Sequence, residues 1–306
     1  MVSVVFCCLA VAIAACEAAL YVEQALPFHN GSLATRYFDV GHQSDSNLNS
    51  MVFYPTVAGT YPVFFFIPGF RGMIPSNMHK DYLSGVASHG YVVVSTDHID
   101  FDSVAAKTTH FTKRFEWMKT NLNGLLTSKS SGVKVDWNYI AMGSHSAGAE
   151  IIIAMMKQNR DNVKAAVFLE PMVTGLSTPI TFHLPALMYG TELAEQGGFL
   201  LFPPCVFSQF DYKHVYDNWT PTKVMIESKG YGHCDILDKA GYNLCSTLHL
   251  CQMHRGVDLH VYQRYLQGIT TGFLSANMLG RNDAMKYVIQ KELSPIPLLQ
   301  LQYKLK

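Results

Sequence analysis

The chain has 306 residues, with 23 basic and 23 acidic side chains and a formal net charge of zero. It contains no basic run or stripe, so the electrostatic footprint of a nucleic-acid-binding protein is missing and a neutral binding partner is favoured. The length is near the upper limit for one hydrophobic core, and α/β domains often reach it. The composition therefore predicts a single domain without a nucleic-acid partner.

The first twenty residues, MVSVVFCCLAVAIAACEAAL, are almost wholly apolar and end in small residues. This pattern is typical of a secretory signal peptide, so residues 1–19 are predicted to be a leader and residues 20–306 a single secreted domain. The run IAAC at 13–16 also resembles a bacterial lipoprotein cleavage site, although the absence of basic residues counts against it. A retained membrane anchor is a further alternative, but the run is short for a span. No later segment is apolar and long enough to cross a membrane, so no stable span is expected.

From residue 61 onward, short β-branched or aromatic runs alternate with helical stretches. The runs are YPVFFFIPG, YVVVSTDH, YIAMGSH, VKAAVFLEP, PALMYG and KVMIES, and the helical stretches include DYLSGVASHG and a long segment from about 105 to 126. This alternation predicts an α/β fold with a mostly parallel central sheet and helices on both faces. Residues 21–58 are predicted to form antiparallel edge strands.

A nucleophile elbow is predicted at SHSAG, residues 144–148, which is one residue away from the pattern G-x-S-x-G. A buried strand is expected before this pentapeptide and a buried helix after it, and a sharp turn between them would expose Ser146. Gly148 provides the small residue that the turn requires, whereas Ser144 replaces the other glycine. A small-residue turn between two core elements is the alternative interpretation.

An acid and a histidine follow this serine in the chain order of an α/β-hydrolase. Glu170 closes the strand VKAAVFLEP, and His233 follows the strand KVMIES in a glycine-containing loop. We expect His233 to act as the general base toward Ser146 and Glu170 to orient its imidazole. Each residue alone could be a surface or structural group, but three matches in the right order favour the catalytic interpretation.

An ester-cleaving serine also needs backbone N–H groups that stabilise a tetrahedral oxyanion. Ala147 directly follows the nucleophile and is expected to provide one N–H. Phe70 is expected to provide the second, because Gly69 lets the loop after the first central strand turn inward. Asp97, which closes another strand, is a minor alternative to Glu170 as the acid.

Residues 194–222 break the strand and helix alternation and are predicted to form an insertion over the C-terminal edge of the sheet, where open α/β folds bind ligands. After the leader, four cysteines remain, and an even number in an oxidising compartment predicts two disulfides with three possible pairings: Cys205, Cys234, Cys245 and Cys251. Sequons at Asn30 and Asn218 are consistent with the secretory route.

The short cluster of Cys245, His249, Cys251 and His254 could imitate a metal site. Its spacing fits no common zinc pattern, and thiols in a secreted chain oxidise. The acidic stretch DHIDFD after residue 96 is likewise interpreted as a loop. Neither a metal nor a cofactor is expected.

Several motifs in succession resemble those of the chlorophyllases, from about residue 50 to 275: YPVFFFIPGF, LSGVASHGYVVVSTDH, SHSAG, LEP, LFPPC and YGHCDILD. The last two are the most specific, since related α/β-hydrolases such as platelet-activating-factor acetylhydrolases lack them. The resemblance implies a cofactor-free enzyme that cleaves the phytyl ester of chlorophyll. It places the nucleophile at Ser146, the acid at Glu170 and the base at His233.

Three positions depart from the chlorophyllase pattern. The family's elbow reads Gly-His-Ser-Arg-Gly-Gly, whereas this chain has Ser144, Ala147 and Ala149 in the corresponding places. The acid is usually aspartate, and the His-Gly of the oxyanion loop is Pro68-Gly69 here. Three hypotheses follow: a secreted chlorophyllase-like serine esterase, a broader carboxylesterase or lipase for hydrophobic esters, and a pigment- or lipid-binding hydrolase fold without catalysis.

Overall fold

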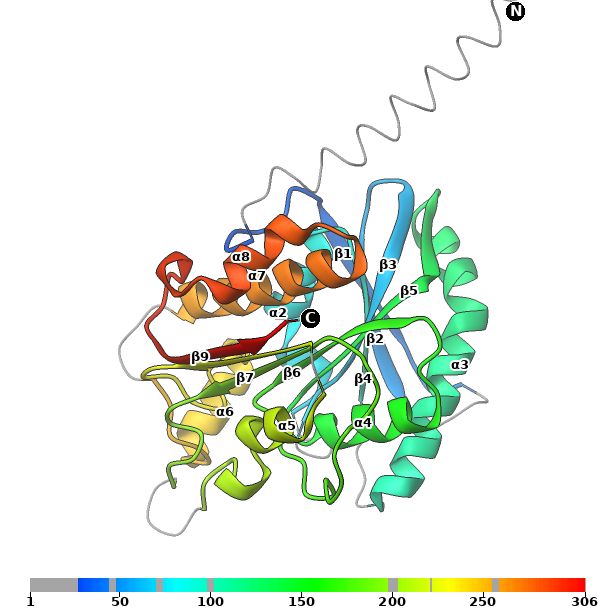
Figure 1. Cartoon of the computed structure of the whole chain (residues 1–306). Helices are drawn as coiled ribbons and strands as arrows, with labels where there is room; N and C mark the ends of the chain where they lie inside the picture. Colours follow the sequence, from blue (N-terminus) through cyan, green and yellow to red (C-terminus); the bar gives the residue numbers. More distant parts are fainter. Residues whose placement is uncertain are drawn as a thin grey trace, which may run out of the picture.

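The computed structural model describes residues 27–43, 48–69, 74–97, 102–197, 203–220, 222–254 and 259–305. The proposed leader 1–19 and Phe70 lie outside these residues. Within them, nine strands form one sheet in the spatial order β1-β2-β4-β3-β5-β6-β7-β8-β9 (Figure 1). The strands are β1 (Thr35–Val40), β2 (Asn49–Pro55), β3 (Gly59–Ile67), β4 (Val92–Asp97), β5 (Val133–His145), β6 (Val163–Leu169), β7 (Ala186–Thr191), β8 (Lys223–Ser228) and β9 (Leu298–Lys304).

The centre of the sheet is parallel and its edges are antiparallel. Strands β4, β3, β5, β6, β7 and β8 pair in parallel with one another. At one edge β1 and β2 pair antiparallel, as do β2 and β4, and at the other edge β9 runs antiparallel to β8. The fold class predicted from the sequence is therefore confirmed.

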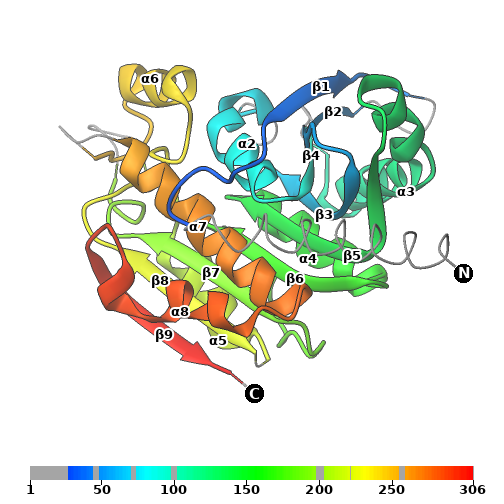
Figure 2. The ribbon, with the colours of Figure 1, turned by 90° about the horizontal axis from the view of Figure 1, so that it is seen from above.

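Helices cover both faces of this sheet (Figure 2). They are α2 (Lys80–Ser88), α3 (Val104–Lys129), α4 (Gly148–Gln158), α5 (Tyr212–Asn218), α6 (Lys239–Leu248), α7 (Leu259–Met278) and α8 (Lys286–Ile289), and short 3-10 turns lie at Ser76–Met78, Ser208–Phe210, Asn282–Met285 and Lys291–Leu293. Side chains of α3, α4 and α5 form one core layer, and those of α2 and α7 form the other. Among the residues that the structure describes, no helix has the length and apolar character to span a bilayer.

The aromatic run in β3 shows why this strand is central. Phe64, Phe65 and Phe66 are all fully buried, and Phe65 joins one core layer while its two neighbours join the other. Successive side chains of a strand point to opposite faces, so a run that is apolar at every position fits only a strand covered on both sides. The interpretation of this run as core is confirmed.

Two parts of the sheet differ from the sequence-based expectation. The strand before the elbow begins at Val133, earlier than the predicted run YIAMGSH. Strand β9 is absent from the predicted elements, because its sequence LLQLQYK has only one buried side chain, Leu298. It forms through pairing with β8 at the sheet edge, a long-range contact that its own residues signal weakly.

Candidate active site

The three residues predicted to act together follow three different strands of the parallel part of the sheet. Ser146 comes directly after β5, Glu170 directly after β6, and His233 lies in the loop after β8. Parallel strands end at the same edge of a sheet, so residues far apart in sequence meet there. All three are buried, with 5%, 2% and 7% of their surface exposed, respectively.

The backbone at Ser146 has the geometry of a sharp turn between strand and helix. Its φ is 55°, in the left-handed region that non-glycine residues rarely adopt. The Ser146 N–H donates to the Leu169 carbonyl at 3.0 Å, and its carbonyl accepts from the Met172 N–H at 3.2 Å. The turn is thus held by the chain that follows β6, and α4 begins two residues later at Gly148.

Glycines let the neighbouring loop approach this turn closely. A Cβ added to Gly148 would lie 2.3 Å from the Ile67 carbonyl oxygen, and one added to Gly69 would lie 2.4 Å from the Ser146 Cβ. Real Cβ atoms do not tolerate such contacts. The end of β3 and the serine turn are therefore packed backbone against backbone, which explains why small residues occur at both positions.

Glu170 and His233 face each other. The Glu170 Oε2 and His233 Nδ1 atoms are 3.6 Å apart, which is ion-pair distance if the imidazole is protonated. Burial raises the pKa of Glu170, and the adjacent His233 partly opposes that shift. Asp97, the alternative acid, instead accepts a 2.8 Å hydrogen bond from the Ser76 N–H at the end of β4.

Ser146 and His233 line one cavity of about 430 Å³ at the C-terminal edge of the sheet. Its walls are mostly apolar, and besides these two residues they comprise Gly69, Ile74, His145, Ala147, Met172, Pro203, Pro204, Cys205, Phe207, Cys234, Leu237, Cys245, Leu250 and Cys251. The segment 203–207 belongs to the predicted insertion, which therefore does contribute to this cavity. A site with apolar walls and few polar groups suits a hydrophobic ligand.

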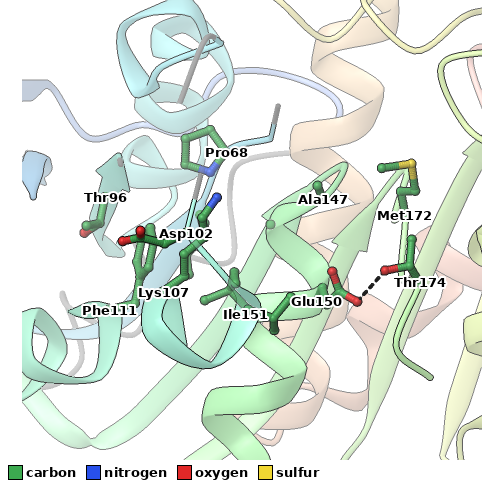
Figure 3. A pocket seen from close by; sticks show the side chains of 13 residues that line it. Pro68, Thr96, Asp102, Lys107, Phe111, Ala147, Glu150, Ile151, Met172 and Thr174 are labelled. Carbon is green, nitrogen blue, oxygen red and sulfur yellow. Dashed lines mark hydrogen bonds between the residues drawn. The ribbon is translucent and has the colours of Figure 1, made fainter. Parts of the chain in front are cut away.

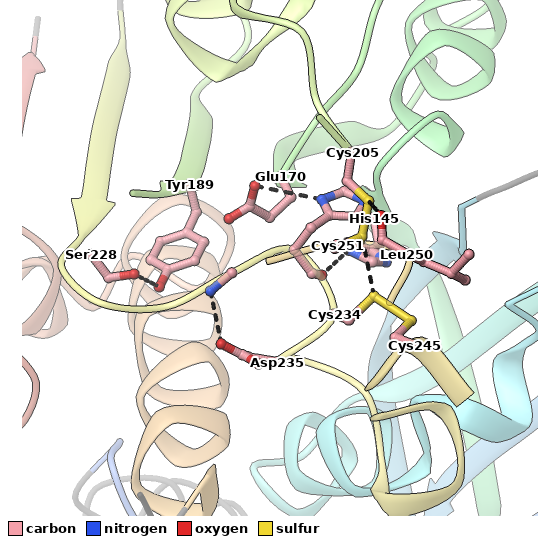
Figure 4. Close-up of polar contacts among 12 residues, drawn as sticks. His145, Glu170, Tyr189, Cys205, Ser228, Cys234, Asp235, Cys245, Leu250 and Cys251 are labelled. Carbon is pink, nitrogen blue, oxygen red and sulfur yellow. Dashed lines mark hydrogen bonds and ion pairs between the residues drawn. A yellow bond between two sulfur atoms is a disulfide. The ribbon is translucent and has the colours of Figure 1, made fainter. Parts of the chain in front are cut away.

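The four cysteines form two disulfides at this cavity, Cys205–Cys251 and Cys234–Cys245 (Figure 4). Of the three pairings left open by the sequence, the structure contains this one. Cys245 and Cys251, the two cysteines of the cluster that could imitate a metal site, each belong to one of these disulfides. Because Cys234 directly follows His233, the Cys234–Cys245 disulfide anchors the loop after β8 to α6. This loop, which carries His233, is called the histidine loop below.

A buried carboxylate that was not among the predicted site residues holds the same loop. Asp235 Oδ2 accepts hydrogen bonds from the Gly232 N–H at 2.7 Å and the His254 N–H at 3.0 Å. Burial raises the pKa of Asp235 to about 6. Tyr231 stacks on the rings of His254 and Tyr262, at 4.6 and 4.2 Å between centroids. The motif YGHCDILD contains Asp235, but its sequence alone gives no sign of which atoms the carboxylate binds.

Ala147 also lines a second, smaller cavity of about 170 Å³ (Figure 3). This second cavity is more polar, and its lining includes Asp102, Lys107 and Glu150. Thr174 and Glu150 both line it, and the Thr174 hydroxyl donates to the Glu150 carboxylate at 2.8 Å. The predicted oxyanion residue Ala147 therefore lies beside the serine, at the start of α4 and in contact with both cavities.

Strand order, the turn at Ser146 and the positions of Glu170 and His233 together define the class: the fold is that of an α/β-hydrolase. The chlorophyllase family model matches residues 23–305, and the chain belongs to this family of ester hydrolases. The resemblance inferred from the motifs is thereby confirmed.

The individual relatives are distant. Chlorophyllase-1 of Arabidopsis thaliana is 23% identical over 266 residues, which cover 77% of this chain and 78% of that protein. Chlorophyllase type 0 of Chenopodium album is 24% identical over 279 residues, covering 79% of this chain and 75% of that protein. Chlorophyllase-2 of Arabidopsis thaliana is 22% identical over 252 residues.

Proposed function

We propose that the protein is a serine esterase of the chlorophyllase type, with Ser146 as nucleophile, His233 as general base and Glu170 as the acid that orients it. The observation that carries the proposal is the buried Glu170–His233 pair beside a cavity that Ser146 also lines. An acid, a base and a serine in this chain order and at one sheet edge are the parts that acyl transfer needs.

In the proposed mechanism, the Ser146 Oγ attacks the ester carbonyl carbon while His233 takes the hydroxyl proton. The resulting oxyanion lies near the N-terminus of α4, where the Ala147 N–H donates to it; Phe70 is proposed as the second donor. His233 then gives its proton to the departing alcohol oxygen. Water, deprotonated by His233, hydrolyses the acyl-enzyme and regenerates Ser146. Each step uses only protein groups and water.

The proposed substrate is the phytyl ester of chlorophyll, which would yield chlorophyllide and phytol. The apolar walls of the main cavity support a hydrophobic ester, and the distant relatives carry the name chlorophyllase. A broader carboxylesterase is the second candidate, because Ala147 stands where the family's elbow has arginine. A non-catalytic pigment-binding role is the third.

The test compares the wild type, Ser146→Ala and the matched control Ser144→Ala with chlorophyll a and with a short-chain nitrophenyl ester. The Ser144 hydroxyl is buried and has no hydrogen-bond partner among the described residues, so its removal should leave turnover unchanged. Chlorophyllide that depends on Ser146 supports the first candidate. Nitrophenyl ester cleavage without chlorophyllide supports the second, and no Ser146-dependent turnover of either ester rejects catalysis.

We also propose that the protein is secreted. The two disulfides support an oxidising compartment, and the Asn30 side chain of the first sequon is exposed. Trp219 of the second sequon is buried and Asn218 donates to the His214 carbonyl, so Asn30 is the better acceptor. N-terminal sequencing of protein from the culture medium should find a start near residue 20, and a start at Met1 would contradict cleavage.

A further inference from the structure

Two further histidines, His79 and His145, connect the proposed base His233 to Pro75, which lies before α2. The His145 Nε2 atom is 3.2 Å from the His233 carbonyl oxygen, and the His145 Nδ1 atom is 3.2 Å from His79 Nε2. At the other end, His79 Nδ1 is 3.3 Å from the Pro75 carbonyl oxygen. The contacts form a continuous chain from Pro75 through His79 and His145 to the main chain of His233.

These side chains come from three separate elements. His79 precedes α2, His145 is the last residue of β5, and His233 follows β8. His79 and His145 are almost completely buried, with 0% and 2% exposure. The His145 ring also stacks on the His233 ring, with 4.6 Å between centroids and 30° between planes. His145 therefore contacts both the imidazole and the main chain of the proposed base.

The number of protons on the two rings limits the hydrogen bonds that they can make together. Its three contacts contain two carbonyl acceptors and one pair of ring nitrogens, so three protons would be needed to make all three hydrogen bonds. Two neutral histidines carry only two N–H groups between them. One of the three contacts must therefore lack a proton. If it is the contact between His79 and Pro75, at 3.3 Å, then His79 Nε2–H donates to His145 Nδ1 and His145 Nε2–H donates to the His233 carbonyl. In this direction the two histidines support the main chain of His233.

The neutral state of both rings agrees with their surroundings. Burial lowers the pKa of His79 to about 4, and burial together with the neighbouring His233 lowers the pKa of His145 well below its ordinary value. A neutral ring stacked on His233 leaves that imidazole free to take a proton during turnover. A cation at the same place would oppose it.

We propose that His145 and His79 are positioning residues for the esterase reaction, forming a two-histidine chain that fixes the main chain and ring plane of His233. The proposal rests on the function proposed above. His145 has two roles in this proposal. Its main chain leads directly into Ser146, and its side chain positions His233, the base that activates Ser146. One residue thereby links the nucleophile turn to the histidine loop.

The test uses kcat and KM for a short-chain nitrophenyl ester. His145→Phe keeps a ring for stacking but removes both hydrogen bonds, and should lower kcat about 10- to 100-fold with KM changed less than about twofold. His145→Gln keeps an amide donor and a carbonyl acceptor and should recover most of that loss. His79→Phe should lower kcat as well, and the double variant His79→Phe/His145→Phe should be no slower than His145→Phe alone.

If the losses in kcat multiply in the double variant, or if His145→Gln recovers no activity, the proposed two-histidine chain is wrong. If His145→Phe fails to fold, nitrogen-15 spectra of histidine-labelled wild type decide the matter. Both His79 and His145 should appear as neutral Nε2–H tautomers, and an Nδ1–H tautomer at His145 would reject the proposed direction. These spectra need no turnover, so they stay informative if the protein proves not to be an esterase.

Discussion

Ser146 and Glu170, two of the three proposed catalytic residues, have left-handed backbone conformations although neither is a glycine. Their φ values are 55° and 50°. Such conformations are unfavourable for residues with a Cβ and persist only where the surroundings enforce them. Here each residue follows directly on a central parallel strand, and the turn points its side chain toward the sheet edge. The backbone strain therefore lies at two of the three residues proposed for catalysis.

We therefore predict that Ser146→Gly is more stable than Ser146→Ala. Both lack the hydroxyl and should be inactive, but only alanine keeps the Cβ that is strained at this φ. The difference in the free energy of unfolding should be about 1 kcal/mol, measured by urea titration. Ala154→Gly in the interior of α4 is the control, and it should lose about 0.5–1 kcal/mol relative to the wild type. Equal stabilities of the two Ser146 variants would show that the turn is unstrained.

Gly69 offers a second prediction at this scale. A Cβ there would lie 2.4 Å from Ser146 Cβ and 3.1 Å from its Oγ, so Gly69→Ala must displace the Ser146 side chain. A displacement of about 1 Å predicts a loss of about 100-fold in kcat for a nitrophenyl ester. At Gly124 in α3 an added Cβ meets nothing within 4 Å, so Gly124→Ala should keep full activity and gain up to about 1 kcal/mol of stability. Unchanged kcat in Gly69→Ala would contradict the close packing.

Among the elements, the loop after β8 is held by a carboxylate that is itself unfavourably buried. Asp235 is fully buried, and one of its oxygens has no hydrogen-bond partner among the described residues. Its pKa of about 6, raised mainly by burial, exceeds the ordinary value, so the folded state binds its proton more tightly than the unfolded state does. Its contribution to stability is present below about pH 4 and is lost as the pH rises toward 6 and beyond.

Asp235→Asn should remove this pH dependence. The asparagine carbonyl can still accept from the Gly232 and His254 N–H groups, but the residue no longer ionises. Above pH 7 the variant should be more stable than the wild type by up to about 3 kcal/mol, and the gap should narrow toward pH 4. Urea unfolding at several pH values measures it, with the exposed Asp283→Asn as control. A gap that stays constant with pH would contradict the raised pKa.

The elements themselves differ in how well the sequence predicts them. Interior strands such as β3 and β8 are apolar runs bounded by turns, and because this pattern is local, the sequence predicts both. Strand β9 is mostly exposed, and the first half of β5 has only two buried residues, Val133 and Val135, before the apolar run begins. Both depend on pairing with a distant neighbour, which no short window of sequence contains.

At the scale of the whole molecule, the sequence predicts the candidate site only where a motif reports on it. Ser146 and Glu170 follow recognisable strands, and His233 follows another, so chain order alone suggested the set. Nothing in sequence indicated that His79 would reach His145, because 66 residues separate them and neither has a local motif for the contact. The disulfide pairing was undetermined for the same reason: it depends on which loops the sheet edge brings together.

The two disulfides should differ in what they support. Cys205–Cys251 closes the longer loop, with a separation of 46 residues against 11 for Cys234–Cys245. Replacing the longer pair by serines should therefore cost about 4 kcal/mol of stability, and replacing the shorter pair about 3. Activity should fall more when the shorter pair is replaced, because Cys234 adjoins His233. Urea titration measures the stability and kcat/KM measures the activity. If replacing the longer pair lowers both quantities more, the disulfides act only through overall stability.

The Cys205–Cys251 disulfide also has a consequence for a chain that a protease has cut. A single cleavage anywhere between these two cysteines leaves both fragments covalently joined. Such a nicked molecule would run as one band in denaturing electrophoresis without reductant and separate into two bands only after reduction. The two pieces of chain that line the cavity would also remain tethered to each other, so a single cut would not separate the walls of the candidate site.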